Sequence, residues 1–399
     1  MTLAMVTYNP NDPALYANPY PTYARLRDEQ PLYHNPDLGI VALSRHVDVS
    51  AAWSDPGLYS SDHGPVIEEF GPDAAEVMGF VAMDPPQHTL MRRLVASGFT
   101  PGRVSRLEPR IRELTRKHLR PLLEQGSGDF ISFATAIPVD VISELIGVPE
   151  ADRPMLLGLS QQIMTRGDIN GRLTPAVTQA NMELGAYYGG LIAERRREPR
   201  DDLASALLQA EIEGRRLSDR EVIATLMLLG VAGNETTARL LGTAWRCAWQ
   251  HPEQRVRVWS GEIKVDRWVE ETLRLEGPSQ YTARRVTRPV ELYGTVVPAN
   301  ALMLLVIAAA NRDERVFPDA DLFDMSRDTS QTLAFGRGPH FCLGAPLARL
   351  EARIVLQELV RAVQVDYDVD MTGASWTTSP NVRGHAKLPT TIKPRTSMT

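Results

Sequence analysis

The sequence is short of cysteine and of long apolar runs. Two cysteines among 399 residues cannot form a disulfide framework and are typical of a protein from a reducing compartment. No uninterrupted apolar stretch reaches the ~20 residues that a membrane helix needs. The opening stretch, MTLAMVTYNPNDPALYANPYP, lacks the basic and apolar regions of a signal peptide. We therefore expect a cytoplasmic protein without membrane insertion.

An excess of positive charge is also lacking. The net charge is −6, whereas proteins that bind nucleic acids usually present a strongly basic face, so we expect no nucleic-acid partner. The chain has instead the composition of a soluble globular protein, 43% hydrophobic and 23% charged, and is long enough to bury a large core. We expect it to act as a monomer.

Helical patterns dominate the chain, and no repeat or low-complexity segment divides it, which predicts one domain over residues 1–399. LYHNPDLGIVALS predicts a hairpin with its turn at Asn35–Gly39. Residues 88–123 predict helices interrupted near Thr100, and residues 288–307 predict extended structure with a turn at Pro298–Asn300. The predicted fold class is mainly α with small antiparallel sheets.

The most informative predicted helix is LSDREVIATLMLLGVAGNETTARLLGTAWRCAWQHP. Ser218 and Glu221 form a capping box at its start, and Pro252 closes its end. Its first half is apolar enough to be buried. Gly230, Gly233 and Glu235 are costly there, because a glycine inside a helix costs about 1 kcal/mol relative to alanine and a buried carboxylate costs more. The pattern indicates a site that needs both space and polarity.

The run FGRGPHFCLG, residues 335–344, surrounds Cys342 with three glycines just before an expected helix. A dinucleotide-binding loop is disfavoured, because Phe341 stands where a glycine is needed and no βαβ unit is apparent. A nucleophilic cysteine would need His340, two residues away, to reach the thiol. A buried structural thiol would leave the glycines unexplained.

Ligation of a metal by a single thiolate explains more of this run. The N-terminus of the following helix would lower the pKa of Cys342 and favour the thiolate. Glycines would keep the loop flat, so that a large planar group could lie against it. One thiolate is too few for zinc, which takes four ligands, but it can hold a haem iron, whose other ligands come with the cofactor.

FGRGPHFCLG resembles the haem-binding signature of the cytochrome P450 family, F-G-x-G-x-H-x-C-x-G, at every fixed position. The resemblance implies the cytochrome P450 fold, with the haem between the long central helix and the helix after the cysteine loop. It implies that Cys342 is the axial thiolate and metal ligand of haem b. Phe335, Gly336 and His340 of the same signature would also bind the cofactor.

AGNETT in the long helix resembles the oxygen-activation motif of the same family. The resemblance implies that Ala232 lies beside the haem. It implies that Glu235 and Thr236 are catalytic and help to deliver protons to bound dioxygen.

Further matches imply contacts to the haem propionates. HTLMRR resembles the family's H-x-x-x-R and assigns His88 and Arg92 to the cofactor. Arg284 in TARRVT fills another family position and is preferred to the adjacent Arg285 because of its spacing to Gly294.

EETLRLE resembles the family's E-x-x-R motif, with Glu271 and Arg274. In the family this pair is buried and is joined by a second arginine, for which Arg327 is the candidate. We assign the three residues to folding rather than to chemistry. Ala320 and Leu322 depart from the residues that relatives often have nearby.

The resemblance implies a haem-thiolate monooxygenase that inserts one oxygen atom of O2 into a C–H bond of a lipophilic small molecule, by hydroxylation or by epoxidation. Electrons would come from a ferredoxin and an NAD(P)H-dependent ferredoxin reductase. A peroxide-driven peroxygenase of the same fold and a non-catalytic haem-thiolate binding or sensing protein are the alternatives. The expected substrate contacts are Phe70, Phe80, Met164, Tyr281 and Trp376, and the expected ferredoxin-docking arginines are Arg93, Arg349 and Arg353.

Overall fold

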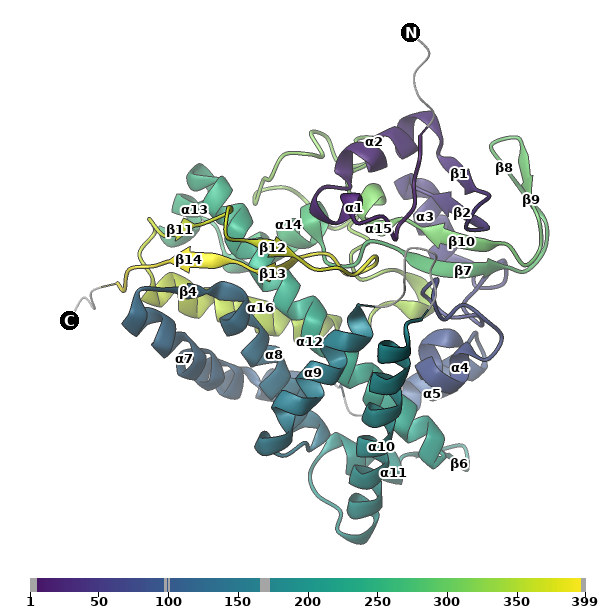
Figure 1. Cartoon of the computed structure of the whole chain (residues 1–399), viewed down its shortest axis with the longest axis horizontal. Helices are drawn as coiled ribbons and strands as arrows, with labels where there is room; N and C mark the ends of the chain where they lie inside the picture. Colours follow the sequence, from purple (N-terminus) through teal and green to yellow (C-terminus); the bar gives the residue numbers. More distant parts are fainter. Residues whose placement is uncertain (1–5, 97–98, 100, 166–172, 396–399) are drawn as a thin grey trace.

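The structure, a computed structural model of the whole chain, describes residues 6–96, 99, 101–165 and 173–395. Helices fill most of the molecule, and a small sheet lies to one side of them (Figure 1). This arrangement confirms the predicted mainly α class. The longer helices are α2 (Tyr20–Glu29), α3 (His46–Ser54), α5 (Gln87–Ala96), α7 (Glu108–Gln125), α8 (Phe130–Ile146), α9 (Arg153–Met164), α10 (Pro175–Arg197), α12 (Asp219–Gln250), α13 (Pro252–Trp259), α14 (Val265–Glu276) and α16 (Ala345–Ala362).

Short helices connect these elements: α1 (Ala14–Ala17), α4 (Ala74–Met78), α6 (Pro101–Arg106), α11 (Leu203–Gln209) and α15 (Ile307–Ala310). Three 3₁₀ turns, at Gly79–Ala82, Glu150–Asp152 and Gly338–His340, are also described. The predicted interruption near Thr100 falls between α5 and α6, where residues 97, 98 and 100 lie outside the described part of the chain. Among the described helices, none combines the length and the apolarity needed to cross a membrane.

The main sheet has the strand order β1 (Leu32–Asn35), β2 (Ile40–Leu43), β10 (Leu302–Leu305), β7 (Thr282–Val286) and β3 (Tyr59–Ser60). The hairpin β1–β2 confirms the predicted turn, in which Asn35 pairs with Ile40. The sheet is not wholly antiparallel as predicted, because β10 runs parallel to β2. Strands so far apart in sequence need no tight turn between them, so either direction is possible.

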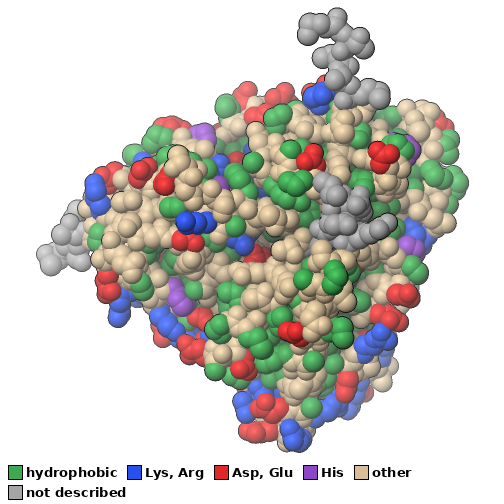
Figure 2. Space-filling view, in the orientation of Figure 1, with side chains coloured by type: hydrophobic (Ala, Val, Ile, Leu, Met, Phe, Trp, Pro, Cys, Tyr) green, Lys and Arg blue, Asp and Glu red, His purple; other side chains and the backbone are tan. Residues whose placement is uncertain are grey.

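The described residues form four smaller sheets, and each is antiparallel. They are β11–β14–β4 (Asp368–Val369, Pro389–Thr391 and Ser127–Asp129), β12–β13 (Ser375–Trp376 and His385–Lys387), β8–β9 (Val290–Leu292 and Thr295–Val297) and β5–β6 (Glu211–Ile212 and Arg215–Arg216). The pair β8–β9 and strand β10 confirm the predicted extended structure, and Asn300 in the turn has a positive φ of 65°. Acidic and basic side chains lie interspersed on the face shown in Figure 2.

Helix α12 is continuous over 32 residues and packs against α8, α9, α10, α14 and α16. Its N-terminus has the predicted capping box of Ser218 and Glu221. Gly230 gives space to a neighbouring helix, because a Cβ at this position would collide with the hydroxyl of Tyr188 on α10. Part of the space that the sequence indicated is therefore used for helix packing.

Glu271 and Arg274 form the predicted buried pair on α14. Arg274 donates to the two carboxylate oxygens of Glu271 at 2.8 and 2.7 Å, and both side chains are 1% exposed or less. Arg274 also donates to the backbone carbonyls of Ala320 and Leu322, so these unusual residues contribute through their backbone. Arg327 joins the pair by a longer contact, with its Nε 3.4 Å from Oε1 of Glu271.

Arg274→Ala is expected to lower the free energy of unfolding by about 3–5 kcal/mol, because it leaves the buried carboxylate of Glu271 without its main partner. Arg327→Ala is expected to cost only about 1 kcal/mol, because its contact is long and Arg274 remains. Urea denaturation followed by circular dichroism compares the two variants. Equal losses of stability would contradict this ranking.

Candidate active site

A cavity of about 350 Å³ lies between α12, the loop that precedes α16 and the start of β7. The cavity is mostly apolar and brings together segments that are distant in sequence. Six of the predicted site residues line it: Ala232, Thr236, Phe335, Gly336, His340 and Cys342. The other four, His88, Arg92, Glu235 and Arg284, lie outside its lining and are described below.

The Cys342 loop is held in shape by its own backbone. The N–H of Cys342 donates to the carbonyl of Phe335 at 2.9 Å, and the N–H of Phe341 donates to the carbonyl of Gly338 at 3.1 Å. The thiol of Cys342 is exposed, but to the cavity that it lines. Helix α16 begins three residues later, at Ala345. This thiol is therefore presented to the interior beside the start of a helix.

The predicted lowering of the Cys342 thiol pKa is wrong. Burial raises the pKa of Cys342 above its usual value. The N–H groups of Gly344 and Ala345 and the guanidinium of Arg92 act in the opposite direction but do not outweigh it. The reason is that removal from water penalises the charged thiolate more than nearby dipoles favour it.

Trp53 of α3 explains two glycines of the loop. Gly336 and Gly338 have positive φ angles of 70° and 65°. A Cβ at Gly336 would lie 2.9 Å from the Trp53 ring, and a Cβ at Gly338 would lie 2.7 Å from the Trp53 carbonyl. The glycines were expected to make room for a planar group, but the structure shows them against α3. Trp53 also lines the cavity, and no local motif in the sequence identifies it.

Two imidazoles lie side by side next to the cavity. The ring centroids of His88 and His340 are 4.0 Å apart. Neither ring nitrogen of His88 has a hydrogen-bond partner among the residues described. Burial, followed by the charge of Arg92, lowers the pKa of His88 to about 4, and burial with Arg284 lowers that of His340 to about 2. Both rings are therefore neutral near pH 7.

Arg284 is a buried cation with neutral partners. It donates to the hydroxyl of Thr282 at 3.2 Å and to the carbonyl of Ala283 at 2.7 Å, and it lies 4.5 Å above the Trp53 ring. Burial lowers its pKa to about 10. The adjacent Arg285 instead forms a two-bond pair with Asp62, at 2.8 and 2.5 Å. Of these two adjacent arginines, Arg285 is therefore paired with a carboxylate, whereas Arg284 bonds to a hydroxyl and a carbonyl in the described structure.

The side chains around Arg284 and the two imidazoles would suit an anionic group. Arg92, which donates to the carbonyl of Phe341 at 2.6 Å, adds a further guanidinium close to the two imidazoles. Buried cations and unpaired donors are stabilised by carboxylates that accept charge-assisted hydrogen bonds. The four basic residues His88, Arg92, Arg284 and His340 therefore have the chemistry that haem propionates require.

Thr236 and Glu235 point in different directions from α12. The hydroxyl of Thr236 donates to the carbonyl of Ala232 at 2.8 Å, and both residues line the cavity. Glu235 is 3% exposed and forms an ion pair with Arg239, one turn further along the helix. Arg239 donates in turn to the carbonyl of His385 at 2.5 Å. The sequence did not identify Arg239 as the partner of Glu235.

Two of the five residues expected to contact the substrate line the cavity. Met164 and Tyr281 line the cavity. Phe80 belongs to the helical core, Phe70 packs beside the main sheet, and Trp376 stacks on His385. Other lining residues were not predicted individually, among them Val66, Met78, Ile163, Asn181, Met227, Leu228, Val231, Thr237, Ser279 and Asn381.

Known proteins resemble the chain over nearly its full length. The family model named Cytochrome P450 matches residues 265–382. A protein of Mycobacterium tuberculosis named as cytochrome P450 123 is 44% identical over 391 residues, which are 97% of each chain. The chain belongs to the cytochrome P450 family. Vitamin D(3) 25-hydroxylase of Pseudonocardia autotrophica is 37% identical over 96% of each chain.

Solved structures agree with this membership of the cytochrome P450 family. Cytochrome P450 CYP109Q5 from Chondromyces apiculatus has a TM-score of 0.87 and 34% identity, covering 98% of this chain and all of that one. The family consists of haem-thiolate monooxygenases, so the chain is an enzyme that uses haem, O2, a source of electrons and a small-molecule substrate.

Proposed function

We propose that the Cys342 thiolate would ligate the iron of haem b and that the cavity lined by Cys342 would hold a lipophilic small molecule. The observation that carries the proposal is that Cys342 and Thr236, from distant parts of the chain, line one cavity. When bound, haem b activates O2, so that one oxygen atom enters a C–H bond of the substrate or, in an epoxidation, a C=C bond. The mostly aliphatic lining supports a lipophilic substrate.

The chain's own residues would hold the cofactor and move protons. Arg92 and Arg284 would neutralise the two haem carboxylates, and the rings of His88 and His340 would donate hydrogen bonds to them. Phe335, Gly336 and the small Ala232 would lie against the ring. The hydroxyl of Thr236 can turn from the carbonyl of Ala232 and donate a proton into the cavity. Glu235 would relay the replacement proton: after it leaves Arg239, its carboxylate would take a proton from solvent and pass it to Thr236.

Cys342→Ala is expected to abolish the strongly red-shifted absorption band that a thiolate-ligated haem shows after reduction under carbon monoxide. Cys247→Ala is the control, because Cys247 is buried in the helical core and burial raises its pKa to about 12. Absorption spectra of both reduced variants test the assignment. A normal band in the Cys342 variant would remove this residue as the ligand.

Thr236→Val is expected to lower product formation by ~10²–10⁴-fold while NAD(P)H consumption continues and more peroxide is released, because a positioned proton donor is lost. Thr236→Ser is the matched control, since it keeps the hydroxyl. Glu235→Gln should instead slow the whole cycle, because proton supply fails. Product, peroxide and NAD(P)H are measured together. Full coupling in Thr236→Val would rule out its catalytic role.

We also propose that a ferredoxin, reduced by an NAD(P)H-dependent reductase, donates the electrons. Phe341, next to Cys342, is 40% exposed and offers a short route inward. The docking arginines are more neutralised than expected: Arg349 pairs with Glu270 at 2.6 Å, Arg353 pairs with Glu108 at 3.2 Å, and Arg93 contacts Glu213 at 3.2 Å. Their contribution is therefore steering at long range rather than strong local attraction.

Arg353→Glu is expected to slow reduction by ferredoxin about tenfold at low salt and to weaken the salt dependence of the rate. The effect should fade near 0.1 M salt, where the Debye length is about 10 Å. Arg25→Glu on α2 is the control, since Arg25 is also ion-paired and similarly exposed, with 38% against 32% of the side chain accessible. Equal behaviour of the two variants in stopped-flow reduction would exclude this dock.

Turnover assays on the haem-containing enzyme distinguish a monooxygenase from the peroxide-driven peroxygenase. Turnover with NADPH, reductase and ferredoxin but little turnover with hydrogen peroxide alone is expected, because Glu235 and Thr236 are both present.

We further propose one domain over residues 1–399 and a cytoplasmic monomer. The full-length match to the relatives supports the single domain, and two free thiols are typical of a reducing compartment. Light scattering tests the monomer.

A further inference from the structure

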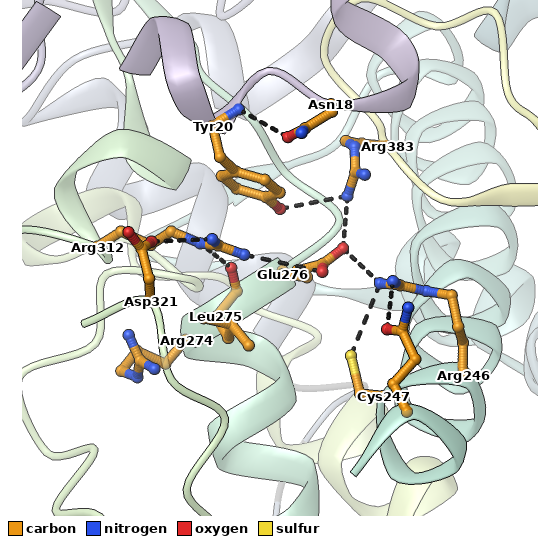
Figure 3. A network of polar contacts seen from close by, with 12 residues as sticks. Asn18, Tyr20, Arg246, Cys247, Arg274, Leu275, Glu276, Arg312, Asp321 and Arg383 are labelled. Carbon is orange, nitrogen blue, oxygen red and sulfur yellow. Dashed lines mark hydrogen bonds and ion pairs between the residues drawn. The ribbon is translucent and has the colours of Figure 1, made fainter. Parts of the chain in front are cut away.

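Glu276, the last residue of α14, is the centre of a buried cluster of arginines (Figure 3). Its carboxylate lies 2.6 Å from Arg246, 2.7 Å from Arg383 and 3.7 Å from Arg312. All four side chains are 11% exposed or less. Burial alone would raise the pKa of Glu276, but the charges of Arg246 and Arg383 outweigh it and hold the pKa well below its usual range.

Arg383 is the most strongly held of these arginines. Its guanidinium donates to the carbonyls of Tyr16 and Ala17 at 3.1 and 2.6 Å and to the hydroxyl of Tyr20 at 3.2 Å. It also lies 4.1 Å above the ring of Trp376. A guanidinium that is hydrogen-bonded, paired and stacked in this way has one position, which a lysine cannot reproduce.

The backbone beside Arg383 forms one wall of the cavity. The N–H of Arg383 donates to the carbonyl of Pro278 at 2.8 Å, and the N–H of Gln280 donates to the carbonyl of Asn381 at 2.9 Å. Ser279 and Val382 pair as an isolated antiparallel bridge between these two bonds. This wall consists of Pro278, Ser279, Asn381 and Val382, all of which line the cavity.

The ion pair of Glu276 and Arg383 lies at one end of these two hydrogen-bonded segments. Glu276 lies two residues before the first strand of the wall, and Arg383 directly follows the second. The first segment continues into β7 and the second into β13, and ahead of these strands the two backbone bonds and the Ser279–Val382 bridge join the segments. The salt bridge between Glu276 and Arg383 adds a side-chain restraint to these backbone bonds.

We infer that Arg383, held by Glu276, is a positioning residue that fixes the wall of Pro278, Ser279, Asn381 and Val382 and so determines which bulky ligands the cavity accepts. The inference rests on the proposed function of this cavity as the substrate site. Ser279 and Asn381 place a hydroxyl and an amide in a mostly aliphatic lining. The wall thus suits a lipophilic ligand with a hydroxyl or carbonyl group.

Two probes test the inference on the haem-containing enzyme. Imidazole is small enough to reach the iron without touching the wall, whereas clotrimazole ligates the iron through the same ring but fills the cavity with its aromatic groups. Arg383→Lys is expected to raise the Kd of clotrimazole about tenfold, which corresponds to 1.4 kcal/mol of binding free energy. The Kd of imidazole should stay unchanged. Both values come from titration of the haem absorption band.

Arg312→Lys is the matched control. Arg312 belongs to the same cluster and donates to the carbonyl of Leu275 at 2.8 Å, but its backbone N–H bonds to Ala309 and not to the wall. This variant should leave both Kd values unchanged. In either variant two arginines still neutralise Glu276, so both proteins are expected to fold. Tyr20→Phe, which removes one bond to Arg383, should shift the clotrimazole Kd in the same direction and serves if Arg383→Lys is insoluble.

The outcomes separate this inference from the proposed function. An unchanged clotrimazole Kd in Arg383→Lys, or in Tyr20→Phe where that variant takes its place, would overturn the inference. An equal change for both azoles, or the same loss in Arg312→Lys, would also overturn it. Failure of the proposed function would appear earlier, as the absence of the carbon monoxide band and of any azole shift in the unaltered enzyme.

Discussion

Buried charges on α14 hold the irregular segments around the cavity. Irregular backbone lacks the regular donors and acceptors of helices and sheets, so its buried polar groups need other partners. Arg274 supplies donors to three carbonyls of the segment that leads to the Cys342 loop, and Glu271 accepts the N–H of Asp324 from the same segment. Five residues beyond Glu271, Glu276 binds the C-terminal segment through Arg383. One helix thus restrains two sides of the site.

The basic side chains without a carboxylate partner among the described residues and the paired carboxylate of Glu235 lie in different places around the cavity. On one side, Arg284 and the neutral rings of His88 and His340 form a surrounding suited to carboxylates. On the other side, Glu235 is neutralised by Arg239 and does not line the cavity. The aliphatic lining between them has a low dielectric, where each of these charges acts more strongly than in water. The substrate space is consequently apolar although many ionisable groups lie close to it.

Residues 230–236 of α12 serve both the packing of the helix and the lining of the cavity. Gly230 admits the hydroxyl of Tyr188, and the amide of Asn234 donates to the carbonyl of Gly230 at 2.7 Å. Asn234 and Thr236 of AGNETT therefore each donate to a carbonyl of the same helix, and Thr236 also lines the cavity. No kink is needed, and the helix continues to Gln250. A single rigid element can thus place Ala232 and Thr236 opposite Cys342.

The local sequence pattern was sufficient to predict several secondary-structure elements and the motif residues. The capping box of Ser218, the hairpin at Asn35 and the buried pair of Glu271 and Arg274 depend on residues close together in the chain, and each was predicted correctly. The long cysteine signature likewise specified the family. These features depend on spacing, which a sequence states directly.

Only the tertiary structure revealed the partners that lie far apart in the chain. Trp53 against the glycines of the Cys342 loop, Asp62 beside Arg285 and the wall held by Arg383 join segments with no common motif. The parallel pairing of β10 with β2 is of the same kind. Each contact depends on how helices and strands pack in three dimensions, and desolvation in that packing also raises the thiol pKa that a helix N-terminus alone would lower.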